Sequence, residues 1–209
     1  MRHLLLLVAC LCSSFSLAFS QNASTYAEEI AQHRQGYIAK LLSSEYAPFW
    51  PEDSTHIQYF PADSTFRVVA KFERTEGAKP FQLPTYSKIT KPFVQYGTLT
   101  FELHDSTYQL AVYRNLQATR MPMYRDLLFL PIKDQTSGQS TYGGGRYLDL
   151  STNEIHRGQL LLDFNKLYNP YCAYGSGWNC PVPPAGNHLP VAILAGEKAY
   201  AGPQRERRE

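Results

Sequence analysis

Residues 93–115 read FVQYGTLTFELHDSTYQLAVYRN, and apolar and polar side chains alternate on either side of a short polar turn. The apolar positions of the two arms are Leu99, Phe101 and Leu103, then Tyr108, Leu110 and Val112. Alternation with a period of two is typical of a half-buried β-strand, and a connection as short as His104-Asp105-Ser106 joins antiparallel neighbours. The stretch therefore predicts a β-hairpin.

Similar segments continue on both sides of this hairpin. They predict further strands over residues 56–60, 65–73, 125–132, 146–150, 159–164 and 189–195. Leu160, Leu161 and Leu162 are apolar on both faces, so we expect the strand that carries them to be central and covered on both sides. About eight or nine short strands without a βα alternation predict a mainly β domain, an antiparallel barrel or sandwich.

One helix is expected before the strands. Ile30, Tyr37 and Leu41 lie along one face of residues 25–43, and polar side chains occupy the remainder. Residues 1–20 combine a basic start, an apolar run and small residues, which together predict a signal peptide. We therefore expect an exported protein, periplasmic or extracellular. Lipid attachment at Cys10 is the alternative, but its apolar stretch would be short.

The charge and hydropathy of the chain argue against nucleic-acid binding and against a membrane-spanning helix. We expect a single domain over residues 21–200 and a disordered, charged tail over residues 201–209. The formal net charge is +2, and loss of Arg2 with the leader lowers it to +1. A near-neutral chain lacks the basic footprint of a nucleic-acid-binding protein. No segment after the leader is apolar over the roughly 18 residues that a membrane helix needs. The oligomeric state stays open.

Cys172 and Cys180 are the cysteines that remain after the leader, and they flank a loop rich in turn formers. In an exported protein such a pair favours a disulfide. Zinc is the sharper alternative, with His188 as a third ligand, but the spacing resembles no short zinc knuckle. We expect a disulfide, no metal and no cofactor.

Polar side chains crowd the last third of the chain. Arg146 follows three glycines, whose amides could converge on an anion, but a simple turn or bulge before a strand is the favoured explanation, and Arg146 stays a candidate ligand anchor or buried partner of a carboxylate. Asp163, Asn165 and Asn169 gather where a predicted strand ends. Each alone fits the bracing of a loop, whereas their crowding favours a ligand site.

The same region resembles a known family. The order D-x-T-x-G, T-Y-G-x-G-R-Y, D-F-N-x-x-Y-N-P-x-C-A-Y, C-P-x-P and A-G-E-K over residues 134–198 is similar to the family called domain of unknown function 1684. His188 departs from the pattern, because this family more often carries Arg there. The resemblance implies no reaction. It implies these shared positions: Asp134, Thr136, Thr141, Tyr142, Arg146, Asp163, Asn165, Tyr168, Asn169, Cys172, Cys180 and Glu197.

Three functional hypotheses follow. The first is a pocket for a small polar or anionic ligand, and its binding residues would be Arg146, Asn165, Asn169, Tyr142, Tyr168 and Asp134. The second is a hydrolase in which Asp163 and Glu197 form the acid and base pair, which requires both carboxylates in one cleft. The third is a structural or interaction module of the cell envelope, which would show an exposed apolar patch instead of a polar pocket.

Overall fold

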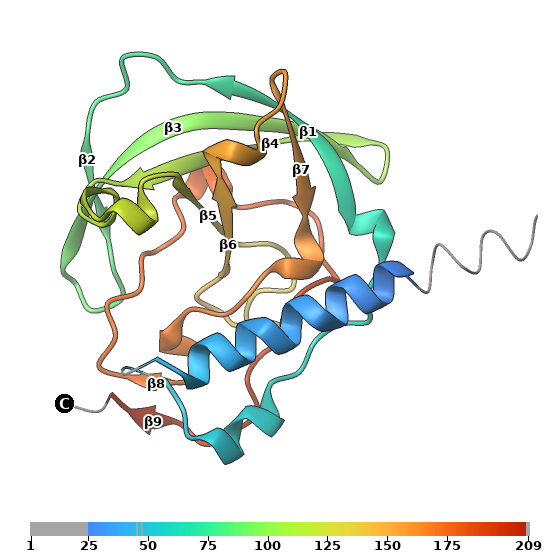
Figure 1. The fold of residues 1–209 in the computed structure, drawn as a ribbon, viewed down its shortest axis with the longest axis vertical. Helices are drawn as coiled ribbons and strands as arrows, with labels where there is room; N and C mark the ends of the chain where they lie inside the picture. The colour runs from blue at the N-terminus through green and yellow to red at the C-terminus, as the bar shows by residue number, and fades with distance from the viewer. Residues whose placement is uncertain (1–24, 45, 47, 208–209) are drawn as a thin grey trace, which may run out of the picture.

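A computed structural model describes residues 25–44, 46 and 48–207. Its centre is a seven-stranded antiparallel sheet in the order β6-β5-β4-β3-β1-β7, with β2 paired to β3. The sheet curls into a half-barrel, as Figure 1 shows. The strands are β1 (Arg67–Arg74), β2 (Phe81–Pro84), β3 (Thr90–Leu103), β4 (Ser106–Asn115), β5 (Leu127–Ile132), β6 (Arg146–Ser151) and β7 (Gln159–Asp163).

The expected mainly β class is confirmed, with nine strands and one main helix in the described part of the chain. The last two strands, β8 (Gly175–Ser176) and β9 (Arg205–Glu206), form a separate parallel pair. The predicted hairpin is β3 and β4, which pair from Phe93 with Asn115 to Leu103 with Ser106. His104 and Asp105 at its tip have φ of 48° and 59°, which suits a two-residue hairpin turn.

The concave face of the sheet holds the main core. Alternate side chains of the sheet strands other than β2 point into it, including Leu99, Leu110 and Leu148. Residues 189–195 cover this core through Leu189, Ile193 and Ala195, but they form no strand, contrary to our prediction. Their backbone partners are scattered, because the segment bonds to loop backbone and to buried polar side chains instead of a neighbouring strand.

Two other strand predictions were wrong. β7 lies at an edge of the sheet and pairs only with β1, and Leu161 is 49% exposed, so the three leucines do not mark a strand covered on both sides. Residues 56–60 are not a strand either. A 3-10 helix, Pro51–His56, precedes them, and Tyr59 makes an isolated bridge with Glu197.

The helix prediction is confirmed, because residues 25–42 are helical and Ile30 and Leu41 are buried. In Figure 1 this helix, in blue, lies across the open side of the half-barrel. Among the described residues, no helix is long and apolar enough to cross a membrane. The predicted signal peptide, residues 1–20, lies outside the described residues.

The tail prediction needs correction for residues 205–207. Arg205 and Glu206 form β9, and the Arg205 guanidinium donates to both carboxylate oxygens of Asp53, at 2.8 and 2.9 Å. Asp53 is buried, so this ion pair and the pairing with β8 fix the segment.

Candidate functional site

Arg146 is fully buried at the start of β6. Its guanidinium donates to the Asp134 carboxylate at 2.9 Å and to the carbonyl oxygens of Ile193, Ala195 and Glu197. Burial lowers the pKa of Arg146, while the charge of Asp134 opposes that shift. The side chain thus clamps residues 193–197 onto the sheet.

Asp134 organises its own turn as well. One carboxylate oxygen accepts hydrogen bonds from the Thr136 backbone and hydroxyl and from the Ile193 amide. The Thr136 hydroxyl also lies 2.8 Å from that of Thr141. The D-x-T spacing is therefore explained by a buried turn in which the Asp134 carboxylate also binds Arg146.

Glu197 is also fully buried. Its carboxylate accepts from the backbone amide and the side-chain amide of Asn169, at 2.9 and 2.8 Å, and from the Tyr174 hydroxyl at 2.7 Å. Burial raises the pKa of Glu197 to about 7, although these hydrogen bonds oppose the shift. Glu197 therefore pins the loop that follows β7.

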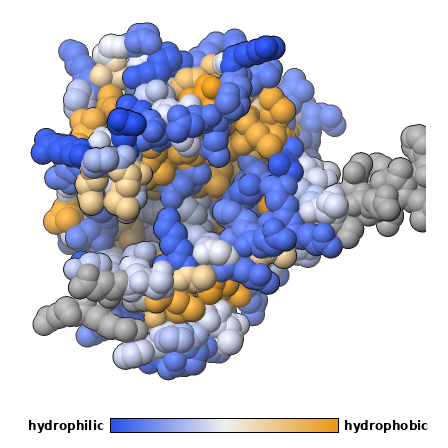
Figure 2. All heavy atoms as spheres, viewed as in Figure 1, coloured by the Kyte–Doolittle hydropathy of each residue, from blue (hydrophilic) through white to orange (hydrophobic). Residues whose placement is uncertain are grey.

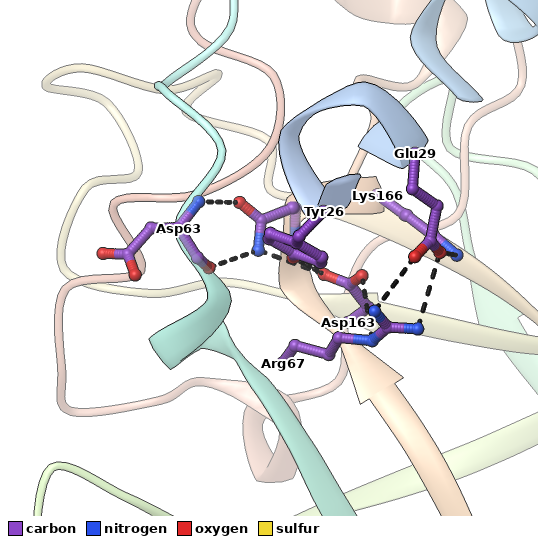
Figure 3. A network of polar contacts seen from close by, with 7 residues as sticks. Tyr26, Glu29, Asp63, Arg67, Asp163 and Lys166 are labelled. Carbon is purple, nitrogen blue, oxygen red and sulfur yellow. Dashed lines mark hydrogen bonds and ion pairs between the residues drawn. The ribbon is translucent and has the colours of Figure 1, made fainter. Parts of the chain in front are cut away.

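Asp163 belongs to a third polar network, shown in Figure 3. It accepts from Tyr26 at 3.1 Å and from the backbone and side chain of Asn165 at 3.0 and 3.1 Å. Arg67 lies between Asp163 and Glu29, and Lys166 contacts Glu29 at 3.4 Å. The network joins the N-terminal helix to the ends of β1 and β7.

Most of the predicted site residues therefore fall into three polar networks, in which they bind one another. Arg146, Asn165, Asn169 and Glu197 are 0% exposed, and Asp134 is 8% exposed. Tyr142 is half-buried, and its ring covers Gly144. Asp163 lines one cavity of about 310 Å³, but Glu197 is fully buried and lines none of four main cavities in the described part of the chain. The hydrolase pair thus has no cleft lined by both carboxylates.

The expected disulfide between Cys172 and Cys180 is present. It closes the loop that carries β8 and Trp178, whose indole contacts Tyr171 at 4.7 Å between ring centroids. Among the described residues, no group of three or more His, Cys, Asp or Glu side chains gathers as metal ligands would.

A cavity of about 720 Å³ lies between the N-terminal helix, strands β5 and β6, and the loop after β7. Figure 2 shows this face hollowed between the sheet and the β8–β9 pair. Its walls are aromatic: Tyr37 from the helix, Phe129 and Tyr147 from the strands, and Tyr168, Tyr171 and Trp178 from the loop. Of the predicted site residues, it contains Tyr168 and Cys180.

Asp149 is the carboxylate of this cavity. It lies on β6 and accepts a hydrogen bond of 2.8 Å from the Tyr168 hydroxyl, and the Tyr168 ring packs against Tyr37 at 5.1 Å. Two smaller cavities, of about 420 and 310 Å³, also reach Asp149. Desolvation by the surrounding protein raises the pKa of Asp149, while the hydrogen bond from Tyr168 and the charge of Lys40 oppose that shift.

Three cations line the same cavity: Lys40 on the helix, Lys91 on β3 and Arg207 beyond β9. None of them forms an ion pair within the described part of the chain. Burial lowers the pKa of Lys91. The arrangement gives an aromatic chamber with an excess of positive charge around one carboxylate.

Sequence reasoning missed Asp149, Lys40 and Lys91. The available signal was Asp149 itself, a carboxylate between two leucines at a position where β6 points outward. Lys40 and Lys91 gave no signal, because an isolated lysine on a helix or strand usually faces solvent.

Comparison with known proteins places the chain in a family. The model of the family described as protein of unknown function (DUF1684) matches residues 52–198. A solved structure, the solution NMR structure of an uncharacterised protein of Haloarcula marismortui, is 30% identical, with a TM-score of 0.57 over 90% of this chain and 95% of that one. No curated protein matches the chain. Because the family match covers more than half of the sequence, this chain belongs to the DUF1684 family.

Proposed function

We propose that the protein binds a small anionic molecule that carries a ring, in the aromatic cavity beside Asp149. The observation that carries the proposal is a set of three cations that have no ion-pair partner among the described residues and that line an aromatic chamber. Its volume of about 720 Å³ is in the range of small-molecule sites, roughly 300–1,000 Å³.

The aromatic walls favour a flat or ring-shaped ligand. Tyr147 stands edge-on to Phe129 and Tyr168, with centroids 4.7 and 5.9 Å away. Such rings offer faces and edges to an apolar ring surface. The walls thus suit an aromatic acid or an acidic sugar.

The cations favour a negative charge on the ligand. Lys91 is partly desolvated and has no carboxylate partner in the part of the chain that the structure describes, so its ammonium group is less stable there than in water. An anionic ligand would supply the missing partner. A hydrogen bond between ionised groups is worth about 1.5–3 kcal/mol, roughly a tenfold change in affinity or more.

Asp149 and Tyr168 would orient the ligand. The carboxylate accepts one hydrogen bond from Tyr168 and is exposed toward the cavities, so it can accept another from a ligand hydroxyl. The carboxylate also opposes a second negative charge nearby, which directs the anionic end of the ligand toward Lys40 and Lys91.

Matched pairs of probes test this proposal. We expect isothermal titration calorimetry and thermal melts to show binding of 4-hydroxybenzoate over its neutral amide, or of glucuronate over glucose. Lys91→Met should weaken the anionic member roughly tenfold and leave the neutral member unchanged. Asp149→Asn should weaken the neutral member, since it alters the acceptor for the hydroxyl.

The controls are a Lys→Met and an Asp→Asn substitution at exposed positions outside the cavity. Lys79→Met changes an exposed loop lysine, and Asp105→Asn changes the exposed tip of the β3–β4 hairpin. Both should bind like the wild type. If no probe binds at millimolar concentration, or if Lys91→Met leaves the preference for the anion intact, the proposal fails.

We also propose that the protein is exported. The Cys172–Cys180 disulfide supports this, because such bonds persist mainly in oxidising compartments. Cell fractionation, with mass spectrometry of the unreduced protein, tests it. A cytosolic protein with free thiols at both positions would contradict it.

A further inference from the structure

One wall of the cavity is built by two segments far apart in the sequence. The Cys172–Cys180 loop carries β8, and residues 204–207, which we call the strap, lie along it. Gln204 donates to the Ala173 carbonyl, Arg205 to Tyr174 and Arg207 to Ser176, each at 3.1 Å. The strap is therefore attached as a parallel strand to the disulfide loop.

A second contact fixes the strap at its start. The Arg205 guanidinium makes two hydrogen bonds with Asp53, which is only 3% exposed. Bidentate pairs of this kind set orientation as well as position. The backbone bonds and this ion pair together determine where Arg207 enters the cavity.

The Arg207 side chain lies between two aromatic rings. Its guanidinium carbon is 5.1 Å from the centroid of Trp178 and 5.3 Å from that of Tyr46, and all three residues line the cavity. Contact with ring faces holds a guanidinium without using its N–H groups. Its donors have no carboxylate partner among the described residues.

We propose that the strap is part of the binding site and that Arg207 selects the anionic group of the ligand. This inference rests on the proposed function and adds to Lys91 a second residue that contributes to the preference for an anion. A guanidinium held in place loses little freedom when it binds a carboxylate or phosphate, and its planar fork matches both. Lys40 and Lys91 add charge but no such geometry.

The disulfide has a positioning role in this arrangement. It encloses residues 173–179, which include every backbone partner of the strap and the Trp178 ring. Without the bond, the loop gains freedom and the strap loses a fixed partner. Selectivity for the anion should then fall although no ligand contact has been removed.

The test measures the ratio of dissociation constants for the neutral and the anionic probe of each pair. Arg207→Met should lower the preference for the anion about tenfold without changing the affinity for the neutral probe, and Arg207→Lys should retain part of it. Arg205→Met and the double variant Cys172→Ser/Cys180→Ser should lower the preference in the same direction. Arg114→Met, which removes another arginine stacked on a tyrosine, is the matched control.

The possible outcomes distinguish this inference from the proposed function on which it rests. A wild-type protein that binds neither member of any pair overturns the proposed function and this inference with it. Binding by the wild type with a preference that Arg207→Met leaves intact overturns this inference alone. Because Arg207 is exposed, its substitution should leave the melting temperature unchanged, and near-ultraviolet circular dichroism checks that the fold is retained.

Discussion

Glu197 should make the stability of this protein fall as the pH rises, and Glu197→Gln should remove that dependence. The carboxyl is fully buried, and its pKa rises from an ordinary value of 4.5 to about 7. A folded-state pKa above the unfolded one means that the folded protein holds the proton more tightly. The stabilisation is therefore complete below pH 4.5 and is lost as the pH rises through about 7.

The magnitude follows from proton linkage. One pKa unit corresponds to about 1.4 kcal/mol, so the shift contributes about 2.5 kcal/mol to the fall in unfolding free energy between pH 5 and pH 8. Glu197→Gln cannot ionise, but its amide would face the backbone N–H of Asn169. That donor–donor contact lowers the free energy of unfolding by the same amount at every pH. The informative quantity is therefore how the difference in unfolding free energy between the two proteins changes with pH.

Urea unfolding of both proteins at several pH values between 5 and 8 measures this quantity. His33 gives the opposite trend, because partial desolvation and the charge of Lys166 lower its pKa. The two proteins share His33, so the difference between their unfolding free energies cancels it. A difference that stays flat from pH 5 to pH 8 would refute a carboxyl held protonated by burial.

Other substitutions test how a buried ion pair, the disulfide and two glycines contribute to stability. Arg146→Met should cost about 3–5 kcal/mol in urea unfolding, because it leaves the buried Asp134 carboxylate without its cation; a loss under 1 kcal/mol would contradict that role. Cys172→Ser/Cys180→Ser should cost about 2–3 kcal/mol relative to the oxidised wild type, and the reduced wild type, which also lacks the bond, should lose a similar amount. Gly196→Ala should lower the melting temperature, since φ is +77° and a Cβ would lie 2.6 Å from that of Leu167, with a cost of about 1–3 kcal/mol. Gly36→Ala is its counterpart: this helical glycine has open space around it, so the melting temperature should rise by the equivalent of about 0.5–1 kcal/mol.

The fold could be predicted where one face of a strand is buried and the other is solvated. β3 and β4 satisfy this condition, and their alternation predicted both strands and the turn between them. β7 does not, because Leu161 is apolar and yet exposed at a sheet edge, so its neighbours suggested burial on both faces. Residues 189–195 look like a strand because they are apolar and extended, but Arg146 and Asp134 replace part of the ladder.

The candidate site was harder to predict for a different reason. Its walls come from separate segments, and no two of Tyr37, Lys91, Asp149 and Trp178 are near each other in the sequence. A tyrosine on a helix or a lysine on a strand carries no sign of a cavity until the fold brings them together. Crowded polar motifs are visible in a sequence, but the pattern cannot distinguish groups that bind a ligand from groups that bind one another.

The buried motifs nevertheless explain why the cavity has its shape. Glu197 holds Asn169, and Asn169 lies between Tyr168 and Pro170, which both line the chamber. The Tyr168 backbone pairs with Tyr147, and its hydroxyl reaches Asp149. The polar network thus positions the aromatic walls without touching a ligand. Substitutions within it should lower stability first and affinity only as a consequence, whereas substitution of Asp149 should lower affinity alone.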